Sequence, residues 1–291
     1  MPERTRIDIA SLMGKKQRGE KISMLTAYDH PTARLLDEAG VDSILVGDSA
    51  GNVVLGYKDT LPVTMDEMVM LTRAVTRAVR HAFVIGDMPF MSFNVTPAKA
   101  IVNAGRFVKE GGAQAVKLEG GAAVVRTVKA IMGAGIPVCG HLGLTPQTAN
   151  QLGGYRVQGK TAAAAKKIFD DAIRLEDAGV MMIVVECIPD RVAAAIAARV
   201  KVPLIGIGAG PHCDGQVLVI NDLLGLSFGF SPKFVKRYAD LGRAISRAAG
   251  SYCNDVARGK FPAKAHSFEM EDNEFARFER LVRSAPRSPL R

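Results

Sequence analysis

Hydrophobic residues in this chain recur as short, almost wholly apolar runs that alternate with longer amphipathic segments. The clearest run, Ala113–Leu118, follows a glycine pair and stops at Glu119. Similar runs stop at Asp48, Asp87 and Glu186, and all but the one before Asp87 begin after a glycine that would end a helix. An apolar run of this length is typical of a strand that is buried on both faces. The pattern therefore indicates a parallel sheet covered by helices.

The repeated pattern predicts eight strand–helix units in succession. We expect strands over 21–27, 41–48, 82–87, 113–119, 136–140, 180–186, 203–207 and 216–220. We expect helices over 7–18, from Asp29, from a Thr64 capping box, and over 97–110, 122–134, 161–178, 189–200 and from a Ser231-Pro232 cap to about Arg258. No linker rich in proline and glycine divides these units. Right-handed crossovers close them more naturally as a (βα)8 TIM barrel than as an open sheet.

A barrel of this kind takes up roughly 250 residues, so a chain of 291 residues has room for appendages. We expect one barrel domain over 1–262, with an N-terminal capping helix, and a polar C-terminal extension over 263–291. Within that extension, 271–284 have a helical pattern and 285–291 form a basic tail, so we expect it to be partly disordered. The glycine-containing stretch 142–160 follows a strand end, which favours an active-site lid over a disordered loop.

Composition narrows the class of function. The net charge of +9 fits a nucleic-acid binder, a solubility feature or attraction of acidic small molecules. Basic residues are scattered along the chain and only five tyrosines are available for stacking, which disfavours nucleic acid. The four cysteines lack CxxC spacing, so we expect reduced thiols rather than disulfides or a zinc site. No apolar run approaches the length of a membrane span, and we expect a cytoplasmic protein.

Three acidic residues, Asp48, Asp87 and Glu119, end consecutive predicted strands. Neighbouring strands lie about 4.8 Å apart, so three carboxylates at one edge of the sheet would span roughly 10 Å and repel one another. A hard divalent cation would relieve this repulsion, and an all-oxygen ligand set predicts Mg²⁺. Zinc would require histidine or cysteine. The alternative is that the acids pair with lysines and arginines at the rim of the barrel.

Lys117 lies two residues before Glu119, so both side chains point to the same face of the strand. A lysine inside the barrel needs partners, which could be Glu119 or an anionic substrate. Glu186 ends a strand across the barrel mouth and has apolar neighbours, which suits a general base. His141, at the end of the preceding strand, could bond to substrate, orient Glu186 or have only a structural role.

Several motifs resemble those of the ketopantoate hydroxymethyltransferase (3-methyl-2-oxobutanoate hydroxymethyltransferase) family. They are Met24–Asp29, Val46–Ser49, Asp59–Thr64, Val116–Gly121, Pro137–Gln147 and Gly206–Gly210. The resemblance runs from about Asp8 to Phe268. It implies a barrel of the phosphoenolpyruvate/pyruvate superfamily and the first committed step of pantothenate biosynthesis. In that step, 5,10-methylenetetrahydrofolate gives a one-carbon unit to 3-methyl-2-oxobutanoate, and 2-dehydropantoate forms.

The resemblance implies Mg²⁺ ligands at Asp48, Asp87 and Glu119 and a proton acceptor at Glu186. It implies keto-acid contacts at Asp48, Ser49, Asp87 and Lys117. Ser49 alone among these is not indicated by the strand ends. The Asn221-Asp222 pair departs from the His-Asp that is common in the family, but it lies outside the metal set. The family also implies a homo-oligomer, a decamer built as a pentamer of dimers.

The implied chemistry is consistent with the residues. A 2-oxo acid chelates Mg²⁺, which eases removal of the C3 proton by Glu186, and Lys117 balances negative charge. Two rival functions remain open. Another Mg²⁺-dependent 2-oxo-acid lyase with the same barrel would turn over without folate. A basic nucleic-acid-binding module would bind in a salt-sensitive way and be indifferent to Mg²⁺.

Overall fold

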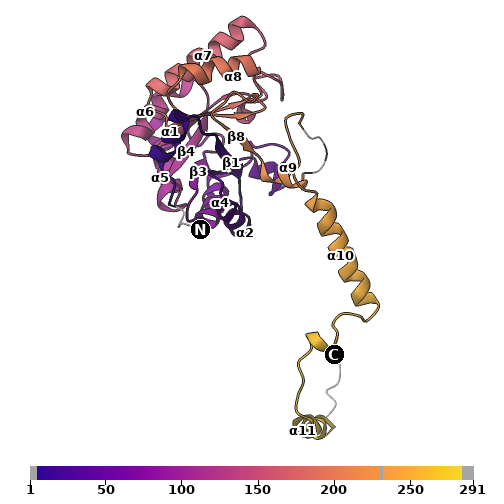
Figure 1. Ribbon diagram of the computed structural model, residues 1–291. Coiled ribbons are helices and arrows are strands. Elements are labelled where there is room, and N and C mark those ends of the chain that lie inside the picture. The colour runs from indigo at the N-terminus through magenta and orange to yellow at the C-terminus, as the bar shows by residue number, and fades with distance from the viewer. Residues whose placement is uncertain (1–4, 228, 230–231, 284–291) are drawn as a thin grey trace. The chain divides into compact units, whose positions relative to one another are not determined.

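The computed structural model describes residues 5–227, 229 and 232–283, and its strands form one closed parallel barrel in the order β1 to β8. Figure 1 shows the strands with helices around them. The strands are β1 (Ile22–Thr26), β2 (Ser43–Val46), β3 (Phe83–Asp87), β4 (Ala115–Glu119), β5 (Val138–Gly143), β6 (Met182–Glu186), β7 (Leu204–Ile207) and β8 (Gly215–Leu218). The predicted (βα)8 barrel is confirmed.

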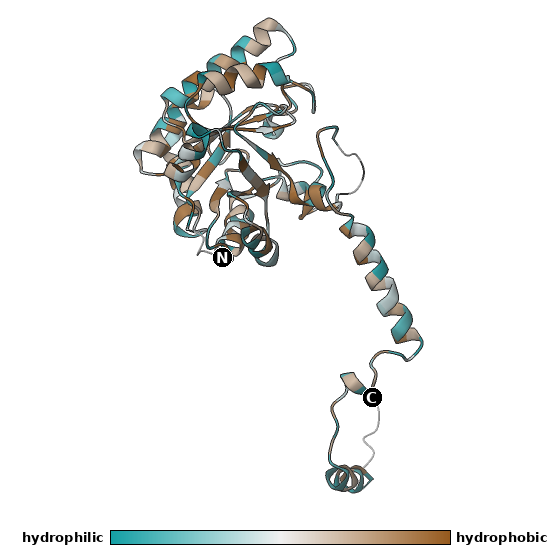
Figure 2. Cartoon of the chain, in the orientation of Figure 1, coloured by the Kyte–Doolittle hydropathy of each residue, from teal (hydrophilic) through white to brown (hydrophobic). Residues whose placement is uncertain are grey.

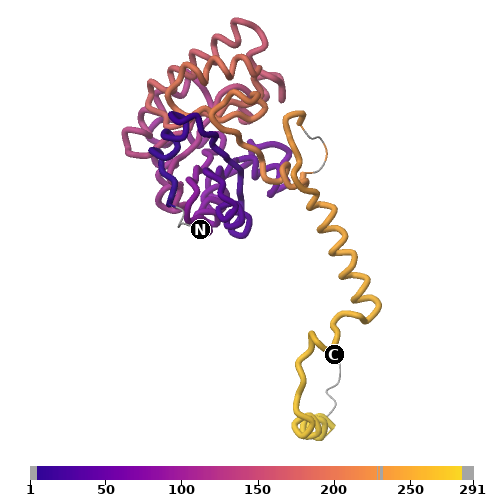
Figure 3. The backbone as a smooth tube through the Cα atoms, viewed as in Figure 1, coloured from indigo at the N-terminus to yellow at the C-terminus, as the bar shows by residue number. Residues whose placement is uncertain are grey.

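Amphipathic helices cover the outside of the barrel. The α-helices up to residue 224 are α1 (Ile9–Gln17), α2 (His30–Ala39), α3 (Ala50–Val53), α4 (Met65–Thr76), α5 (Pro97–Lys109), α6 (Val125–Gly133), α7 (Ala162–Asp177), α8 (Asp190–Arg199) and α9 (Ile220–Leu224). Figure 3 shows the path of the backbone, coloured from the N-terminus to the C-terminus. Thr64 and Glu67 form the predicted capping box at the start of α4, with both reciprocal hydrogen bonds present.

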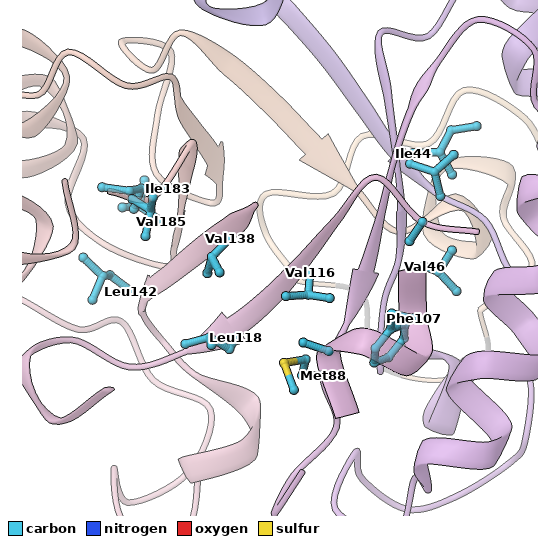
Figure 4. Packing of buried hydrophobic residues seen from close by; sticks show 14 of the residues in the cluster. Ile44, Val46, Met88, Phe107, Val116, Leu118, Val138, Leu142, Ile183 and Val185 are labelled. Atoms are coloured by element: carbon cyan, nitrogen blue, oxygen red, sulfur yellow. The ribbon is translucent and has the colours of Figure 1, made fainter. Parts of the chain in front are cut away.

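Two hydrophobic layers follow from the alternation of side chains along each strand. Outward-facing strand residues, among them Val116 and Leu118, pack with Phe107 of α5 and Met88 in the layer beneath the helices (Figure 4). Inward-facing residues, among them Leu45, form the second layer inside the barrel. Figure 2 shows the hydrophobic colour along the barrel strands. Because the inward face of β4 carries Lys117 and Glu119 in the positions after Ala115, the same alternation points these polar groups into the barrel.

Helix α1 is joined to the amino-terminal ends of the strands. Leu12 is 1% exposed and belongs to the inner hydrophobic cluster. Lys15 Nζ lies 2.6 Å from Asp42 Oδ1, just before β2, and Lys16 Nζ lies 2.7 Å from Asp214 Oδ2, just before β8. These contacts hold α1 at the end of the barrel opposite the carboxyl ends of the strands.

The structure corrects several predicted boundaries. Strand β5 continues to Gly143, so His141 lies inside the strand rather than after it. The stretch 142–160, predicted to be a lid or loop, contains the 3₁₀ helix η2 (Pro146–Thr148), and the short helix α3 follows β2. The helix predicted to start from Pro232 is wrong at its start, because α10 spans Leu241–Ala257. Ser231 of the predicted cap lies outside the described residues.

By its internal contacts the chain divides into residues 1–239 and 240–291. The second unit contains α10, the 3₁₀ helix η3 (Lys264–His266) and α11 (Asp272–Arg283). Helix α11 agrees with the helix predicted over 271–284, whereas the predicted tail over 285–291 lies outside the described residues. Helix α10 therefore belongs to the second unit. The expectation of one barrel domain over 1–262 stays a prediction. Within the described chain, no helix combines the length and apolarity needed to cross a bilayer.

Candidate active site

A cavity of about 660 Å³ lies at the carboxyl ends of the strands. Every site residue predicted from the sequence lines it: Asp48, Ser49, Asp87, Lys117, Glu119, His141 and Glu186. Asp87 and Glu119 are the last residues of β3 and β4, and Asp48 follows β2 by two residues. The closed barrel therefore brings together groups that are far apart in the sequence, in the place where α/β barrels hold their active sites.

Lys117 is the central cation of this cluster. Its ammonium Nζ lies 2.6 Å from Asp87 Oδ1 and 3.9 Å from Glu119 Oε1, and all three side chains are no more than 4% exposed. Burial disfavours the charge on Lys117, but Asp87, Glu119 and Asp48 outweigh it and raise the pKa of Lys117 above its ordinary value. Lys117 therefore pairs first with Asp87 and only secondarily with Glu119.

Asp48 is a buried carboxylate whose charged form is disfavoured by its surroundings. Burial and the neighbouring Asp87 raise the pKa of Asp48 well above its ordinary value, and Lys117 only partly opposes this shift. Oδ2 of Asp48 accepts a hydrogen bond of 2.8 Å from Nε2 of Gln147. The backbone N–H of Asp48 donates to Oδ2 of Asp87 at 3.1 Å. The second contact joins the backbone of Asp48, after β2, to the carboxylate of Asp87 at the end of β3.

His141 lies between the carboxylate of Glu119 and that of Glu186. Nδ1 is 3.2 Å from Glu119 Oε1 and Nε2 is 3.3 Å from Glu186 Oε2. The second contact is an ion-pair distance without hydrogen-bond geometry, since Nε2 has no hydrogen-bond partner among the described residues. Burial lowers the pKa of His141 and so does Lys117, but the two glutamates prevail and raise it to about 9. The two neighbouring glutamates therefore favour the protonated form of His141.

Glu119 and Glu186 differ in their surroundings. Burial raises the pKa of Glu119, but the hydrogen bond and charge of His141, together with Lys117, lower it below its ordinary value. The side chain of Glu186 is 16% exposed, against 3% for Glu119. Glu186 ends β6, and Cys187 then turns the chain with a positive φ of 47°. Glu186 is thus the more accessible carboxylate of the two and faces the cavity.

Sequence reasoning missed two buried residues that support the site. Tyr28 is 3% exposed, and its hydroxyl lies 2.8 Å from Oγ of Ser49, with either oxygen able to donate. Gln147, 4% exposed, contacts two of the carboxylates. Both residues lie in motifs that carry the family resemblance, but nothing local in those motifs reveals the contacts. From the segment after β5, Pro146 and Tyr155 also line the cavity, while closure of 142–160 as a lid stays a prediction.

The fit of this cluster to a cation can be judged from its charges. The residues that line the cavity include five carboxyl groups, those of Asp48, Asp87, Glu119, Glu186 and Asp222, and three basic groups, those of Lys58, Lys117 and His141. With every group ionised, five negative and three positive charges leave an excess of two negative charges. A divalent cation with oxygen ligands would offset this excess. It would also compensate the charge of Asp48, whose pKa is raised by burial and then by the neighbouring Asp87.

The described residues contain no group of three or more His, Cys, Asp or Glu side chains already arranged to hold a metal ion. The carboxylate of Asp87 instead forms an ion pair with the Lys117 ammonium. Mg²⁺ is usually bound through one or two carboxylates, with water and substrate completing the shell, rather than by an all-protein cage. The donor chemistry therefore fits Mg²⁺, while the ligand set Asp48, Asp87 and Glu119 stays a prediction.

Comparison with solved structures identifies the fold. A phosphonopyruvate hydrolase in complex with oxalate and Mg²⁺ matches with a TM-score of 0.57 at 13% identity, covering 96% of this chain and 97% of the other. A 2,3-dimethylmalate lyase, a member of the PEP mutase/isocitrate lyase superfamily, also matches with a TM-score of 0.57, at 17% identity and 95% coverage of both chains. At these identities the likeness shows the shared barrel fold alone.

Comparison with known sequences gives the family. The family model described as ketopantoate hydroxymethyltransferase matches residues 6–264. A 3-methyl-2-oxobutanoate hydroxymethyltransferase of Moorella thermoacetica is 57% identical over 269 residues, which is 92% of this chain and 100% of the relative. The enzyme of that name from Acetivibrio thermocellus is 56% identical over 263 residues, covering 90% and 93%. The chain belongs to the ketopantoate hydroxymethyltransferase family and is an enzyme.

Proposed function

We propose that this enzyme transfers a hydroxymethyl group, derived from 5,10-methylenetetrahydrofolate, to 3-methyl-2-oxobutanoate in a Mg²⁺-dependent reaction that gives 2-dehydropantoate. The observation that carries the proposal is a cavity in which buried acidic groups surround Lys117 and His141, with Glu186 at its accessible side. Membership of the family supplies the reaction. The cavity contains groups suited to holding the metal ion, contacting the 2-oxo acid and accepting a proton.

Asp48, Asp87 and Glu119 are the residues that would hold Mg²⁺. When bound, the ion supplies a Lewis acid that polarises the 2-oxo group of the substrate. The three carboxylates are held by neighbouring donors: Asp87 by Lys117 Nζ, Asp48 by Gln147 Nε2, and Glu119 by the backbone N–H of Gln147. Such donors fix the direction of each carboxylate before substrate enters.

Lys117 and Ser49 are the groups that we assign to the 2-oxo acid. The Lys117 ammonium can balance the substrate carboxylate or the oxygen that becomes negative as the enolate forms. Its raised pKa means that it keeps its charge at neutral pH. The Ser49 hydroxyl, held by Tyr28 at 2.8 Å, supplies a neutral hydrogen-bonding group beside Asp48.

Glu186 is the group that we assign to proton removal. Its carboxylate would accept the C3 proton of 3-methyl-2-oxobutanoate, which leaves the electron pair of the C–H bond in the enolate. The enolate carbon then forms the new bond to the methylene carbon of the folate as one of the two bonds from that carbon to a folate nitrogen breaks. Water displaces the second nitrogen and supplies the hydroxyl oxygen. Tetrahydrofolate leaves, and its two nitrogens take up the C3 proton and one proton of the water. His141, whose Nε2 lies 3.3 Å from Glu186 Oε2, would position this carboxylate and is a second candidate for substrate contact.

Exchange of the C3 proton tests the assignment of Glu186. In deuterium oxide with Mg²⁺, the wild-type enzyme should exchange this proton without folate, because enolisation precedes carbon transfer. Glu186→Gln keeps the shape of the side chain but cannot accept the proton, so exchange should fall by about 10²–10⁴-fold. Glu38→Gln is the matched control, since Glu38 pairs with Arg34 on the exposed surface of α2. Wild-type exchange in Glu186→Gln would transfer the role to another residue, with His141 next.

Two further expectations of the sequence belong to this proposal. We infer a homo-oligomer, a decamer built as a pentamer of dimers, from membership of the family. Light scattering at micromolar concentration should show a particle of roughly ten times the 31.1 kDa chain. A stable monomer would contradict the inference. A cytoplasmic location is the second expectation, and it agrees with the free cysteines of the described chain.

A further inference from the structure

Gln147 connects two of the carboxylates through different parts of the same residue. Its side-chain Nε2 donates to Asp48 Oδ2 at 2.8 Å, and its backbone N–H donates to Glu119 Oε2 at 3.0 Å. Nε2 also donates to the carbonyl oxygen of Met88 at 2.9 Å. One residue in η2 thus contacts groups at the ends of β2, β3 and β4.

The orientation of the Gln147 amide follows from its partners. Both partners of Nε2, Asp48 Oδ2 and the Met88 carbonyl, are acceptors, so only the NH₂ end of the amide can face them. Oε1 consequently points elsewhere, and it is buried without a hydrogen-bond partner among the described residues. A buried acceptor without a partner costs stability. An apolar residue of the same size would avoid that cost but would leave Asp48 Oδ2 and the Met88 carbonyl without this donor, so the feature to be explained is the pair of hydrogen bonds that Nε2 donates.

Gln147 stands behind the carboxylates rather than in the cavity. It is 4% exposed, and the residues that line the cavity include its neighbour Pro146 but not Gln147 itself. It therefore contacts the acids without standing where substrate would bind. Nε2 of Gln147 donates to Oδ2 of Asp48. Among the described residues, Oδ1 of Asp48 has no hydrogen bond.

We propose that Gln147 is a positioning residue that sets the orientation of Asp48 and its spacing from Glu119 for binding of a divalent cation. The inference rests on the proposed function, because it takes these carboxylates as the Mg²⁺ ligands. A neutral donor suits this task, since it fixes a carboxylate without neutralising the charge that attracts the cation. Lys117 does the opposite at Asp87, where it offsets the charge directly.

The test measures Mg²⁺ affinity by calorimetry on metal-free protein, without substrate. Gln147→Met keeps the length of the side chain and the backbone N–H but removes both side-chain donors. We expect its Kd for Mg²⁺ to rise by about 10–100-fold, as for other residues that hold metal ligands in place. Gln151→Met is the matched control, because Gln151 is an exposed glutamine in the same segment, and its Kd should equal that of the wild type.

Two measurements separate a positioning role of Gln147 from a structural role. Thermal unfolding in EDTA shows whether Gln147→Met is folded, and turnover at excess Mg²⁺ shows whether its defect lies in metal binding. If Gln147 positions the ligands, turnover of Gln147→Met recovers as Mg²⁺ is raised to saturation. Loss that excess Mg²⁺ does not restore would overturn the inference. If Gln147→Met does not fold, Gln147→Asn replaces it, since the shorter amide cannot reach Asp48 and should show the same loss of affinity.

The outcomes distinguish this inference from the function on which it rests. Wild-type protein that binds Mg²⁺ while Gln147→Met binds it equally well would overturn the role of Gln147 and leave the proposed function intact. Wild-type protein that binds no Mg²⁺, with or without 3-methyl-2-oxobutanoate, would overturn the proposed metal dependence and this inference with it.

Discussion

Replacing Lys117 by methionine should destabilise the protein strongly, and by an amount that depends on pH. The substitution keeps most of the side-chain volume but removes the ammonium that lies 2.6 Å from Asp87 and 3.9 Å from Glu119. Breaking one side of a buried ion pair typically costs about 3–5 kcal/mol, because the other charge stays buried without compensation. The exposed pair Lys166–Asp170 provides the comparison, since such pairs contribute about 0–1 kcal/mol.

Protonation sets an upper limit on this loss. A carboxyl group with an ordinary pKa of about 3.9 can be neutralised at pH 7 for about 4 kcal/mol, at about 1.4 kcal/mol for each pH unit. At pH 5 the same step costs about 1.5 kcal/mol. In the variant, a carboxyl of the cluster has a pKa in the folded state that lies above its pKa in the unfolded state. The folded protein therefore holds more protons than the unfolded protein at pH values between these two pKa values. Its stability falls as the pH rises through this range. The expected loss is therefore about 3–4 kcal/mol at pH 7 and about 1–1.5 kcal/mol at pH 5.

Urea unfolding in EDTA, followed by circular dichroism at one protein concentration, measures this loss at both pH values. Lys166→Met should change the free energy of unfolding by no more than about 0.5 kcal/mol. A Lys117→Met variant as stable as Lys166→Met at pH 7 would refute the view that Lys117 compensates the buried acids. A large loss that is equal at pH 7 and pH 5 would refute the charge argument and indicate a packing defect.

Three further predictions concern single sites. Asp87→Asn and Glu119→Gln should each weaken Mg²⁺ binding in calorimetry, because each removes a charged oxygen ligand, and unchanged affinity in both would contradict the proposed ligand set. Iodoacetamide at pH 8 should modify the exposed Cys253 in the native protein. It should not modify Cys139, because burial raises the pKa of that thiol to about 12. Labelling of Cys139 in the native protein, detected by mass spectrometry, would show that this thiol is not shielded. Thr64→Ala removes the cap of α4 and should lower the free energy of unfolding by about 1 kcal/mol, whereas no change would mean that the capping box is not needed.

The barrel and its acidic residues were predictable because both follow from local rules. Runs of apolar residues that are buried on both faces cannot contain an unpaired carboxylate, so Asp87, Glu119 and Glu186 mark the points at which β3, β4 and β6 end. The period of two along β4 likewise placed Lys117 on the face of Glu119. Closure of the sheet then brought these residues into one cavity.

Long-range contacts account for what the sequence did not reveal. Gln147 bonds to residues 99 and 28 positions away, and no local pattern encodes such contacts. Strand β5 extends through His141 to Gly143 because its backbone pairs with both β4 and β6, although its glycines suggested a loop. The predicted start of the last long helix near Pro232 relied on a local cap signal, and Ser-Pro sequences occur in turns as well as at helix starts.

The measurement that tests the central claim most directly is the formation of 2-dehydropantoate from 3-methyl-2-oxobutanoate, followed with Mg²⁺ and 5,10-methylenetetrahydrofolate supplied together and separately. The proposed function predicts product only when both are present, with exchange of the C3 proton when Mg²⁺ is present alone. Product that forms equally well in EDTA would contradict the role of the metal. Consumption of the 2-oxo acid without folate would contradict the transferase reaction and favour a lyase of the same fold.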